Sequence, residues 1–167
     1  MLDMNKRGQG VFGMSFGMIF SIIVIIAIIG VAFYVITFFL DLGNCSEIGF
    51  FYDDLQEEVD RAWQGGASQD VFSKALPSGI SHVCFGDLNT AGLLGKDEEI
   101  RDELFYSVRD DMNVYMYPSR KACDGDLAYY DLEHVSLEGF FCVEPLNGKV
   151  EVKISKEVTD ALVKVEK

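Results

Sequence analysis

The feature that most constrains this chain is an apolar stretch from Gly8 to Leu40 in which no side chain is charged. As a helix, its 33 residues would extend about 50 Å at 1.5 Å per residue, more than the roughly 30 Å of hydrocarbon in a bilayer. A water-soluble domain formed by the rest of the chain is too small to bury such a rod on all sides. The stretch therefore predicts a membrane helix and argues against a buried core helix.

Charges on either side of this stretch predict its orientation. Lys6 and Arg7 stand directly before it, Asp41 follows directly after it, and the next basic residue is Arg61. Basic residues beside a membrane helix favour the cytoplasmic side. We therefore expect a single-pass protein of the cell membrane, with lipid around the helix, a cytoplasmic N-terminus and an extracytoplasmic C-terminal domain.

The remainder of the chain is long enough for one modest domain, and it is strongly acidic. The chain has a net charge of −13 and residues 1–8 carry +1, so the other residues carry −14. Such a surface repels the phosphates of nucleic acid and an anionic lipid surface. We expect the charge to keep the domain soluble, and we expect no nucleic-acid partner.

All four cysteines follow the apolar stretch: Cys45, Cys84, Cys123 and Cys142. An even number in an exported domain predicts two disulfides, for which three pairings are possible. A zinc site would favour close pairs such as CxxC, whereas the spacings here are 39, 39 and 19 residues. Cys84 and Cys142 lie in strand-like runs, and Cys45 and Cys123 lie at the edges of elements. We therefore favour the pairs Cys84–Cys142 and Cys45–Cys123.

The N-terminus carries a short motif, Lys6-Arg7-Gly8-Gln9, after which the apolar run begins at once. This arrangement resembles the class III signal peptide of archaeal type IV pilin-like proteins. The resemblance implies that a prepilin-peptidase-type protease cuts between Gly8 and Gln9 on the cytoplasmic side. It also implies that the helix is kept and packs against copies of itself, in some cases in a surface filament.

The resemblance covers about 35 residues, and no family signature is found in the ectodomain. Bacterial pilins carry a glutamate five residues into the mature chain, where this chain has Gly13; the departure argues against a bacterial-type pilin. The alternative is an uncleaved single-span protein whose basic pair is a simple positive flank. Its extracytoplasmic domain would bind a ligand or a partner protein.

Small residues recur at four-residue spacing near the start of the helix, at Gly13, Gly17 and Ser21. This spacing lets two helices approach closely in lipid. It suits self-association in a filament core or in a membrane dimer, and it also arises by chance in a glycine-rich segment.

The junction after the apolar stretch predicts a helix boundary. Gly43 can end the first helix and Asn44 can cap a second one, with Glu47 three residues later. Asn44-Cys45-Ser46 is also a formal N-glycosylation sequon, but we favour the cap. A stem helix should follow as far as Gly65-Gly66. Its apolar stripe comprises Ile48, Phe51, Leu55, Val59 and Trp63, and its acidic residues should face water.

Beyond residue 66 the sequence predicts mostly strands, with one further helix over Asp97–Ser107 that places Ile100, Leu104 and Phe105 inward. Asn147-Gly148 predicts a hairpin between the strand around Phe140–Cys142 and the next strand. The expected strands are Asp70–Leu76, Ile80–Phe85, Asn113–Tyr117, Leu132–Leu137, Gly139–Val143, Lys149–Ile154 and Leu162–Glu166.

These elements predict an α+β fold, in which a long N-terminal transmembrane helix precedes a small disulfide-tied domain of mostly antiparallel sheet with one or two packed helices. The expected organisation is a leader over 1–8, a hydrophobic helix over 9–42, a stem helix over 43–66, and a β-rich domain over 67–167 that packs with the stem.

Motifs for catalysis and metal binding are scarce. His82 lies two residues from Cys84, but its thiol is expected to be in a disulfide, and no GxSxG, HExxH or P-loop motif occurs. Asp124-Gly125-Asp126, with Asp131 nearby, is the strongest metal candidate, yet it lacks the further ligands of an EF-hand and is better explained as a solvated acidic turn. We therefore expect a non-enzymatic protein without a cofactor or metal.

Overall fold

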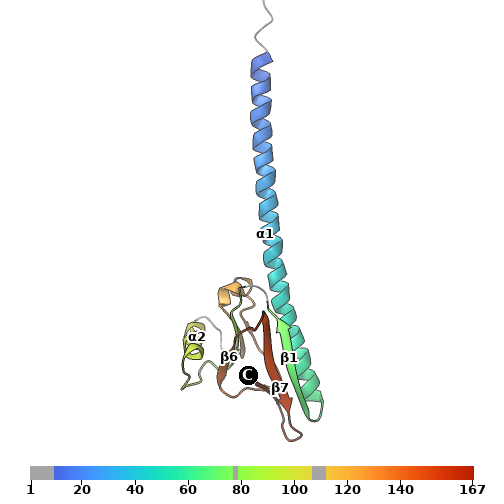
Figure 1. The fold of residues 1–167 in the computed structure, drawn as a ribbon, viewed down its shortest axis with the longest axis vertical. Coiled ribbons are helices and arrows are strands. Elements are labelled where there is room, and N and C mark those ends of the chain that lie inside the picture. Colours follow the sequence, from blue (N-terminus) through green and yellow to red (C-terminus); the bar gives the residue numbers. More distant parts are fainter. Residues whose placement is uncertain (1–9, 77–78, 107–111) are drawn as a thin grey trace, which may run out of the picture. The chain divides into compact units, whose positions relative to one another are not determined.

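The computed structural model describes residues 10–76, 79–106 and 112–167, which divide into two compact units at the boundary between Asp41 and Leu42. One helix, α1 (Gly10–Gln64), contributes to both units (Figure 1). The second unit adds the helix α2 (Lys96–Phe105) and two short 3-10 helices, η1 (Ser119–Lys121) and η2 (Cys123–Gly125). The strands are β1 (Ser68–Ala75), β2 (His82–Gly86), β3 (Val114–Tyr117), β4 (Tyr129–Tyr130), β5 (Val135–Ser136), β6 (Phe140–Val143), β7 (Lys149–Lys156) and β8 (Val163–Glu166).

The strands form two four-stranded sheets. The first has the order β1-β7-β8-β5, and the second has the order β4-β3-β2-β6. All pairings are antiparallel except β5 with β8. The sequence therefore predicts the mostly antiparallel α+β class correctly, but a single sheet is too simple a description.

The first sheet packs on α1 through alternating side chains. Val150, Val152 and Ile154 of β7 are all buried, because residues two apart in a strand face the same side. Phe72 of β1 meets Phe51 of α1 in an edge-to-face contact with ring centroids 5.4 Å apart. The predicted stripe of α1 supplies the other side of this core: Ile48, Phe51, Leu55 and Val59 are fully buried.

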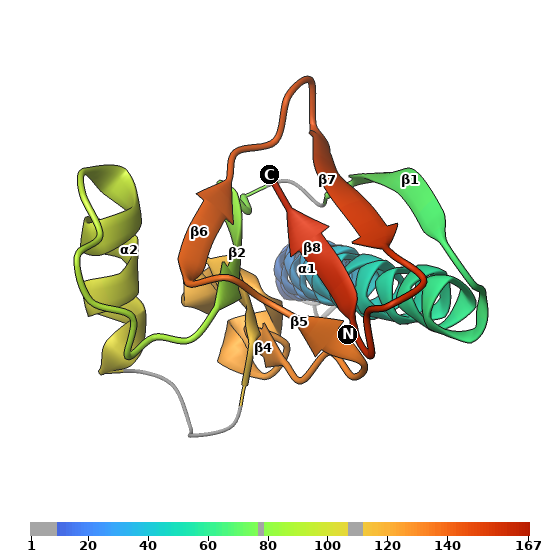
Figure 2. The same ribbon diagram turned by 90° about the horizontal axis from the view of Figure 1, so that it is seen from below.

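The second sheet is covered on both faces, which explains why every residue of β2 is buried. Val83 and Phe85 join the core that contains the α1 residues, whereas Cys84 joins a second core with Ile100 and Leu104 of α2. Figure 2 shows α2 beside β6 and β2, on the side away from α1.

Two disulfides tie this domain together, Cys45–Cys123 and Cys84–Cys142, and they are the pairs that the sequence favours. Cys84 and Cys142 lie opposite each other in the β2–β6 ladder. Cys45 lies in α1 and Cys123 in η2, so this bridge fixes the helix to the segment that follows β3.

The predicted helix boundary at Gly43 and Asn44 is wrong, because α1 continues without interruption to Gln64. A glycine that ends a helix adopts a positive φ, and Gly43 does not. Gly and Asn are only mildly unfavourable inside a helix, about 0.5–1 kcal/mol each relative to Ala. Packing of the helix residues from Ile48 onward outweighs that cost.

The predicted hairpin between β6 and β7 is also wrong. Asn147 and Gly148 do form a tight turn with positive φ, closed by a bridge between Leu146 and Lys149, but β6 pairs with β2 and β7 pairs with β1 and β8. Pro145 follows β6 and has no backbone N–H, so the ladder cannot continue across the turn.

Smaller differences concern the ends of elements. Phe105 is not inward but 52% exposed, since it lies about 100° around the helix from Leu104. Ser107 lies outside the described residues. The predicted strand Leu132–Leu137 is reduced to β5, and β4 was not predicted because two residues are too few to show a period.

Candidate functional site: an uncovered apolar helix and its anchored end

The first part of the candidate site is the apolar surface of α1 between Gly17 and Leu40. Every large apolar side chain from Met18 to Leu40 is exposed, by between 37% and 72%. Among the described residues, α1 is the one helix long and apolar enough to cross a membrane. A surface of this size and composition needs an apolar environment, which its own unit does not provide.

The few polar groups in this segment are satisfied within the helix. The Ser21 hydroxyl donates to the Gly17 carbonyl at 2.9 Å, and the Thr37 hydroxyl donates to the Tyr34 carbonyl at 2.9 Å. Hydroxyl groups bonded in this way do not require water and are tolerated in hydrocarbon. The segment therefore has the chemistry of a helix that lies in an apolar medium.

The small-residue positions are only partly described. Gly13 is helical, and a Cβ atom added at Gly17 would meet no atom within 4 Å, so space for a close neighbour exists there. Ser21 lies one turn further along the same face. The proposed cleavage residues Lys6, Arg7, Gly8 and Gln9 lie outside the described residues.

The second part of the site is the end of α1 that is anchored to the domain. Tyr52 is buried, stacks on Tyr130 with ring centroids 4.7 Å apart, and donates its hydroxyl to the Leu127 carbonyl at 2.9 Å. Burial, followed by the nearby Tyr130, raises the pKa of Tyr52 far above its usual value. Together with the Cys45–Cys123 bridge, this contact holds the helix against the segment around η2.

A polar cluster fixes the last turns of α1 to the loop before β5. The ring of His134 stacks on Trp63 with centroids 3.8 Å apart, and its Nδ1 lies 3.0 Å from an Asp60 carboxylate oxygen. Gln56 donates to the same carboxylate and accepts the backbone N–H of Glu133. The hydrogen bond from His134 is the main reason that the pKa of Asp60 lies below its usual value.

The acidic side of α1 is therefore not simply directed to water. Asp54 pairs with Lys74 of β1, and Arg61 pairs with Glu57 and Glu58 on its own helix. Trp63, expected in the core, is 38% exposed and donates its indole N–H to the Ala161 carbonyl. The three- and four-residue spacing could have suggested the Arg61 pairs from the sequence. Lys74 lies 20 residues from Asp54, and Ala161 lies 98 residues from Trp63, and no local pattern signals partners at such distances.

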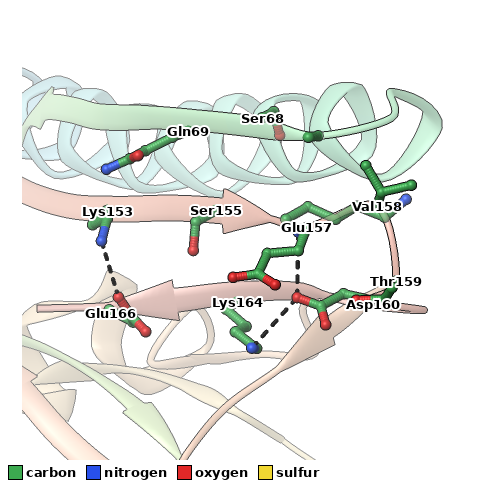
Figure 3. A pocket seen from close by; sticks show the side chains of 12 residues that line it. Ser68, Gln69, Lys153, Ser155, Glu157, Val158, Thr159, Asp160, Lys164 and Glu166 are labelled. Carbon is green, nitrogen blue, oxygen red and sulfur yellow. Dashed lines mark hydrogen bonds and ion pairs between the residues drawn. The ribbon is translucent and has the colours of Figure 1, made fainter.

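One hollow, of about 700 Å³, lies at the end of β7 and β8 (Figure 3). Its lysines are already engaged: Lys153 pairs with Glu166, Lys164 pairs with Asp160, and Lys156 donates to the Trp63 carbonyl. Charges satisfied in this way leave little to attract an anion, so this hollow is a weak candidate for a binding site.

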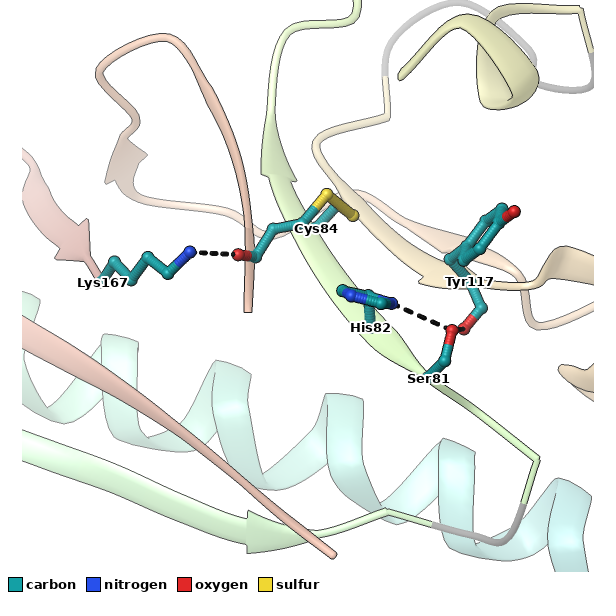
Figure 4. The surroundings of a disulfide bond; sticks show 6 residues. Ser81, His82, Cys84, Tyr117 and Lys167 are labelled. Carbon is teal, nitrogen blue, oxygen red and sulfur yellow. Dashed lines mark hydrogen bonds between the residues drawn. A yellow bond between two sulfur atoms is a disulfide. The ribbon is translucent and has the colours of Figure 1, made fainter. Parts of the chain in front are cut away.

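The described residues contain no group of three or more His, Cys, Asp or Glu side chains placed to hold a metal ion. Asp124 and Asp126 are exposed at η2, consistent with the acidic turn expected from the sequence. His82 is buried beside the Cys84–Cys142 bridge (Figure 4), and Cys84 has no free thiol. A cysteine–histidine nucleophile is thereby excluded at this position.

No family model, no curated protein and no solved structure matches this chain.

Proposed function

We propose that the protein is a non-enzymatic, membrane-anchored surface protein, a pilin-like subunit that is processed after Gly8 and assembles through its hydrophobic helix. The observation that carries the proposal is the continuous apolar surface of α1 from Met18 to Leu40, with its hydroxyl groups bonded internally. In this proposal, lipid covers that surface first and neighbouring copies of the helix cover it afterwards.

Packing between such helices would rely on shape, because lipid chains are as apolar as the side chains they replace. Gly17 offers an open approach to the backbone, and Ser21 adds little bulk one turn later. Gly13 would extend the same face by another turn. A close helix contact at this end would gain van der Waals attraction that lipid supplies less well.

The disulfides support an extracytoplasmic position for the second unit, since such bridges persist in oxidising compartments. The Cys45–Cys123 bridge also fits a subunit whose domain must stay attached to its helix under mechanical load. It joins α1 to a residue 78 positions away, just after the point where the apolar surface ends.

The test of processing is the intact mass of the protein extracted from membranes of the native host. We expect loss of residues 1–8, with Gln9 as the first residue. Gly8→Val should block the cut because a branched side chain obstructs the extended backbone that a protease needs, while Gly10→Val serves as the matched control. A mature chain that retains Lys6 would refute processing.

Assembly needs a separate test, because a processed chain can remain a single membrane protein. We expect antibody against the second unit to label filaments sheared from the cell surface and viewed by electron microscopy. If the processed chain is found only in the membrane fraction, as single copies or small clusters, the filament part of the proposal fails.

The second candidate is an uncleaved single-span protein whose domain binds a ligand. A specific observation favours keeping it: a hollow of about 600 Å³ that is lined by residues of both sheets, with apolar and charged side chains. Retention of Lys6 in the intact mass would support the second candidate over the first, and a ligand bound at this hollow would then give the domain its role.

A further inference from the structure

The hollow between the two sheets is built from both of them. Cys142 and Val143 of β6 form one side, and Val152 of β7 forms the other. Val71 of β1 and Leu146, which are 58% and 71% exposed, add two apolar side chains to its lining. A volume of about 600 Å³ is within the range of pockets that take small organic molecules.

His82 is 5% exposed and lines this hollow, so it brings a buried imidazole to the wall. Its Nδ1 lies 2.9 Å from the Ser81 hydroxyl oxygen. That hydroxyl already donates its proton to the Tyr117 carbonyl at 3.2 Å. With the hydroxyl proton directed to Tyr117, the Ser81 oxygen accepts from His82, and we therefore expect the imidazole proton on Nδ1.

This hydrogen-bond chain leaves Nε2 of His82 as a bare acceptor. No described residue donates to Nε2, and in Figure 4 the ring lies between Ser81 on one side and Lys167 on the other. Burial is the main cause that lowers the pKa of His82, and Lys96 and Lys167 lower it further, whereas Glu144 and Asp97 oppose them. A lowered pKa favours the neutral imidazole, in which Nε2 can accept a hydrogen bond from a ligand.

Charges of both signs surround this acceptor. The lining contains three lysines and three carboxylates, a net charge of zero in a chain whose total is −13. Lys167 donates to the Cys142 carbonyl, and Lys153 pairs with Glu166. Lys96 forms no ion pair with any described carboxylate, and Glu144 forms none with any described cation, so these two groups are available to a ligand.

We infer that the hollow between the two sheets, lined by His82 and Lys96, binds a small zwitterionic ligand with an apolar side chain, the class to which the apolar amino acids belong. The ligand ammonium donates to Nε2 of His82 and lies near Glu144. Its carboxylate pairs with Lys96, and its side chain lies against Val71 and Leu146. This inference is independent of processing at Gly8.

The experiment uses the full chain in lipid nanodiscs, labelled with ¹⁵N at histidine, and leucine as the probe. The two histidines provide an internal control, since His134 is held by Asp60 and Trp63 and does not line the hollow. Without ligand we expect His82 to show a protonated Nδ1 and an unprotonated Nε2. Added leucine should move the Nε2 signal of His82 and leave His134 unchanged.

Three analogues of leucine test the three parts of the ligand. Glycine lacks the apolar side chain, 4-methylpentanoate lacks the ammonium, and isopentylamine lacks the carboxylate. Each should bind at least about tenfold more weakly than leucine, the loss expected when one charge-assisted or apolar contact is removed. Lys96→Met should weaken leucine binding by a similar factor, whereas Lys149→Met, an exposed lysine outside the hollow, should leave it unchanged.

Several results would overturn the inference. A protonated Nε2 of His82 in the free protein would contradict it. So would unmoved His82 signals with leucine up to about 10 mM, a concentration well above a 1 mM dissociation constant. Equal movement of the His134 signals would also contradict it. Equal binding of glycine and leucine, or equal loss in Lys96→Met and Lys149→Met, would also contradict it. Because Lys96 is exposed, its substitution does not endanger the fold.

Discussion

The two halves of α1 share one secondary structure and differ in what surrounds them. Between Met18 and Leu40 all large apolar side chains are exposed, whereas between Ile48 and Val59 the apolar stripe is fully buried against the sheets. The first half is apolar around its whole circumference, whereas the second half carries acidic residues on the face opposite its buried stripe. Helix formation alone therefore says little about environment; the distribution of apolar residues around the axis decides it.

The largest expected effect tests this contrast with one substitution in each half. Phe51→Ala should lower the free energy of unfolding of the second unit by about 3–5 kcal/mol, because it empties a fully buried site. Phe38→Ala, at a side chain that is 55% exposed, should leave that free energy unchanged. Urea unfolding of the full chain in detergent, followed by near-ultraviolet circular dichroism, measures both. Equal losses would show that the halves are not energetically distinct.

A second prediction tests the same contrast by membrane insertion, with one lysine substitution in each half of α1. Ile26→Lys should reduce membrane insertion by about 3 kcal/mol, since a lysine near the centre of a membrane helix costs roughly that amount. Glu57→Lys, on the exposed side of the other half, should not affect insertion. The fraction of each variant that resists alkaline extraction from membranes measures this effect. Full retention of Ile26→Lys would argue against a membrane-spanning segment.

A third and smaller effect concerns the contact that anchors the second half. Tyr52→Phe should destabilise the second unit by about 0.5–1.5 kcal/mol, because it removes the hydrogen bond to the Leu127 carbonyl while keeping the ring in place. Tyr106→Phe is the matched control, since Tyr106 is 90% exposed. Urea midpoints of the two variants compare them directly, and identical midpoints would mean that the Tyr52 hydroxyl is not anchoring the helix.

Patterns that repeat along the chain were predictable, and contacts between distant segments were not. The helical stripe from Ile48 to Val59 and the alternation of β7 are visible in the sequence because each repeats with a regular period. The cysteine pairs followed from their positions inside or at the edges of elements. These features are local, or depend on only four residues of one kind.

The failures have a common cause, which is competition from tertiary structure. Gly43 and Asn44 have the chemistry of a helix end, but the packing of residues from Ile48 onward outweighs it. Asn147-Gly148 has the chemistry of a hairpin turn, yet β7 pairs with β1 in the other sheet. The cluster of His134, Asp60 and Trp63 joins residues more than 70 positions apart, and no spacing in the sequence signals it.

The smallest effect expected is a dependence on pH at the end of α1. The pKa of Asp60 in the folded protein lies below its usual value of 3.8, mainly because His134 donates to the carboxylate. A carboxyl group with a lowered pKa stabilises the fold above its unfolded pKa, and this contribution disappears as the pH falls through the folded pKa. Stability should therefore fall on acidification below about pH 4, more steeply in the native chain than in His134→Gln. Urea midpoints of the two proteins, measured across this pH range, test the prediction. Both proteins keep His82, so the substitution changes only His134. Parallel pH profiles for the two would show that the hydrogen bond between His134 and Asp60 contributes nothing to the anchoring of the helix.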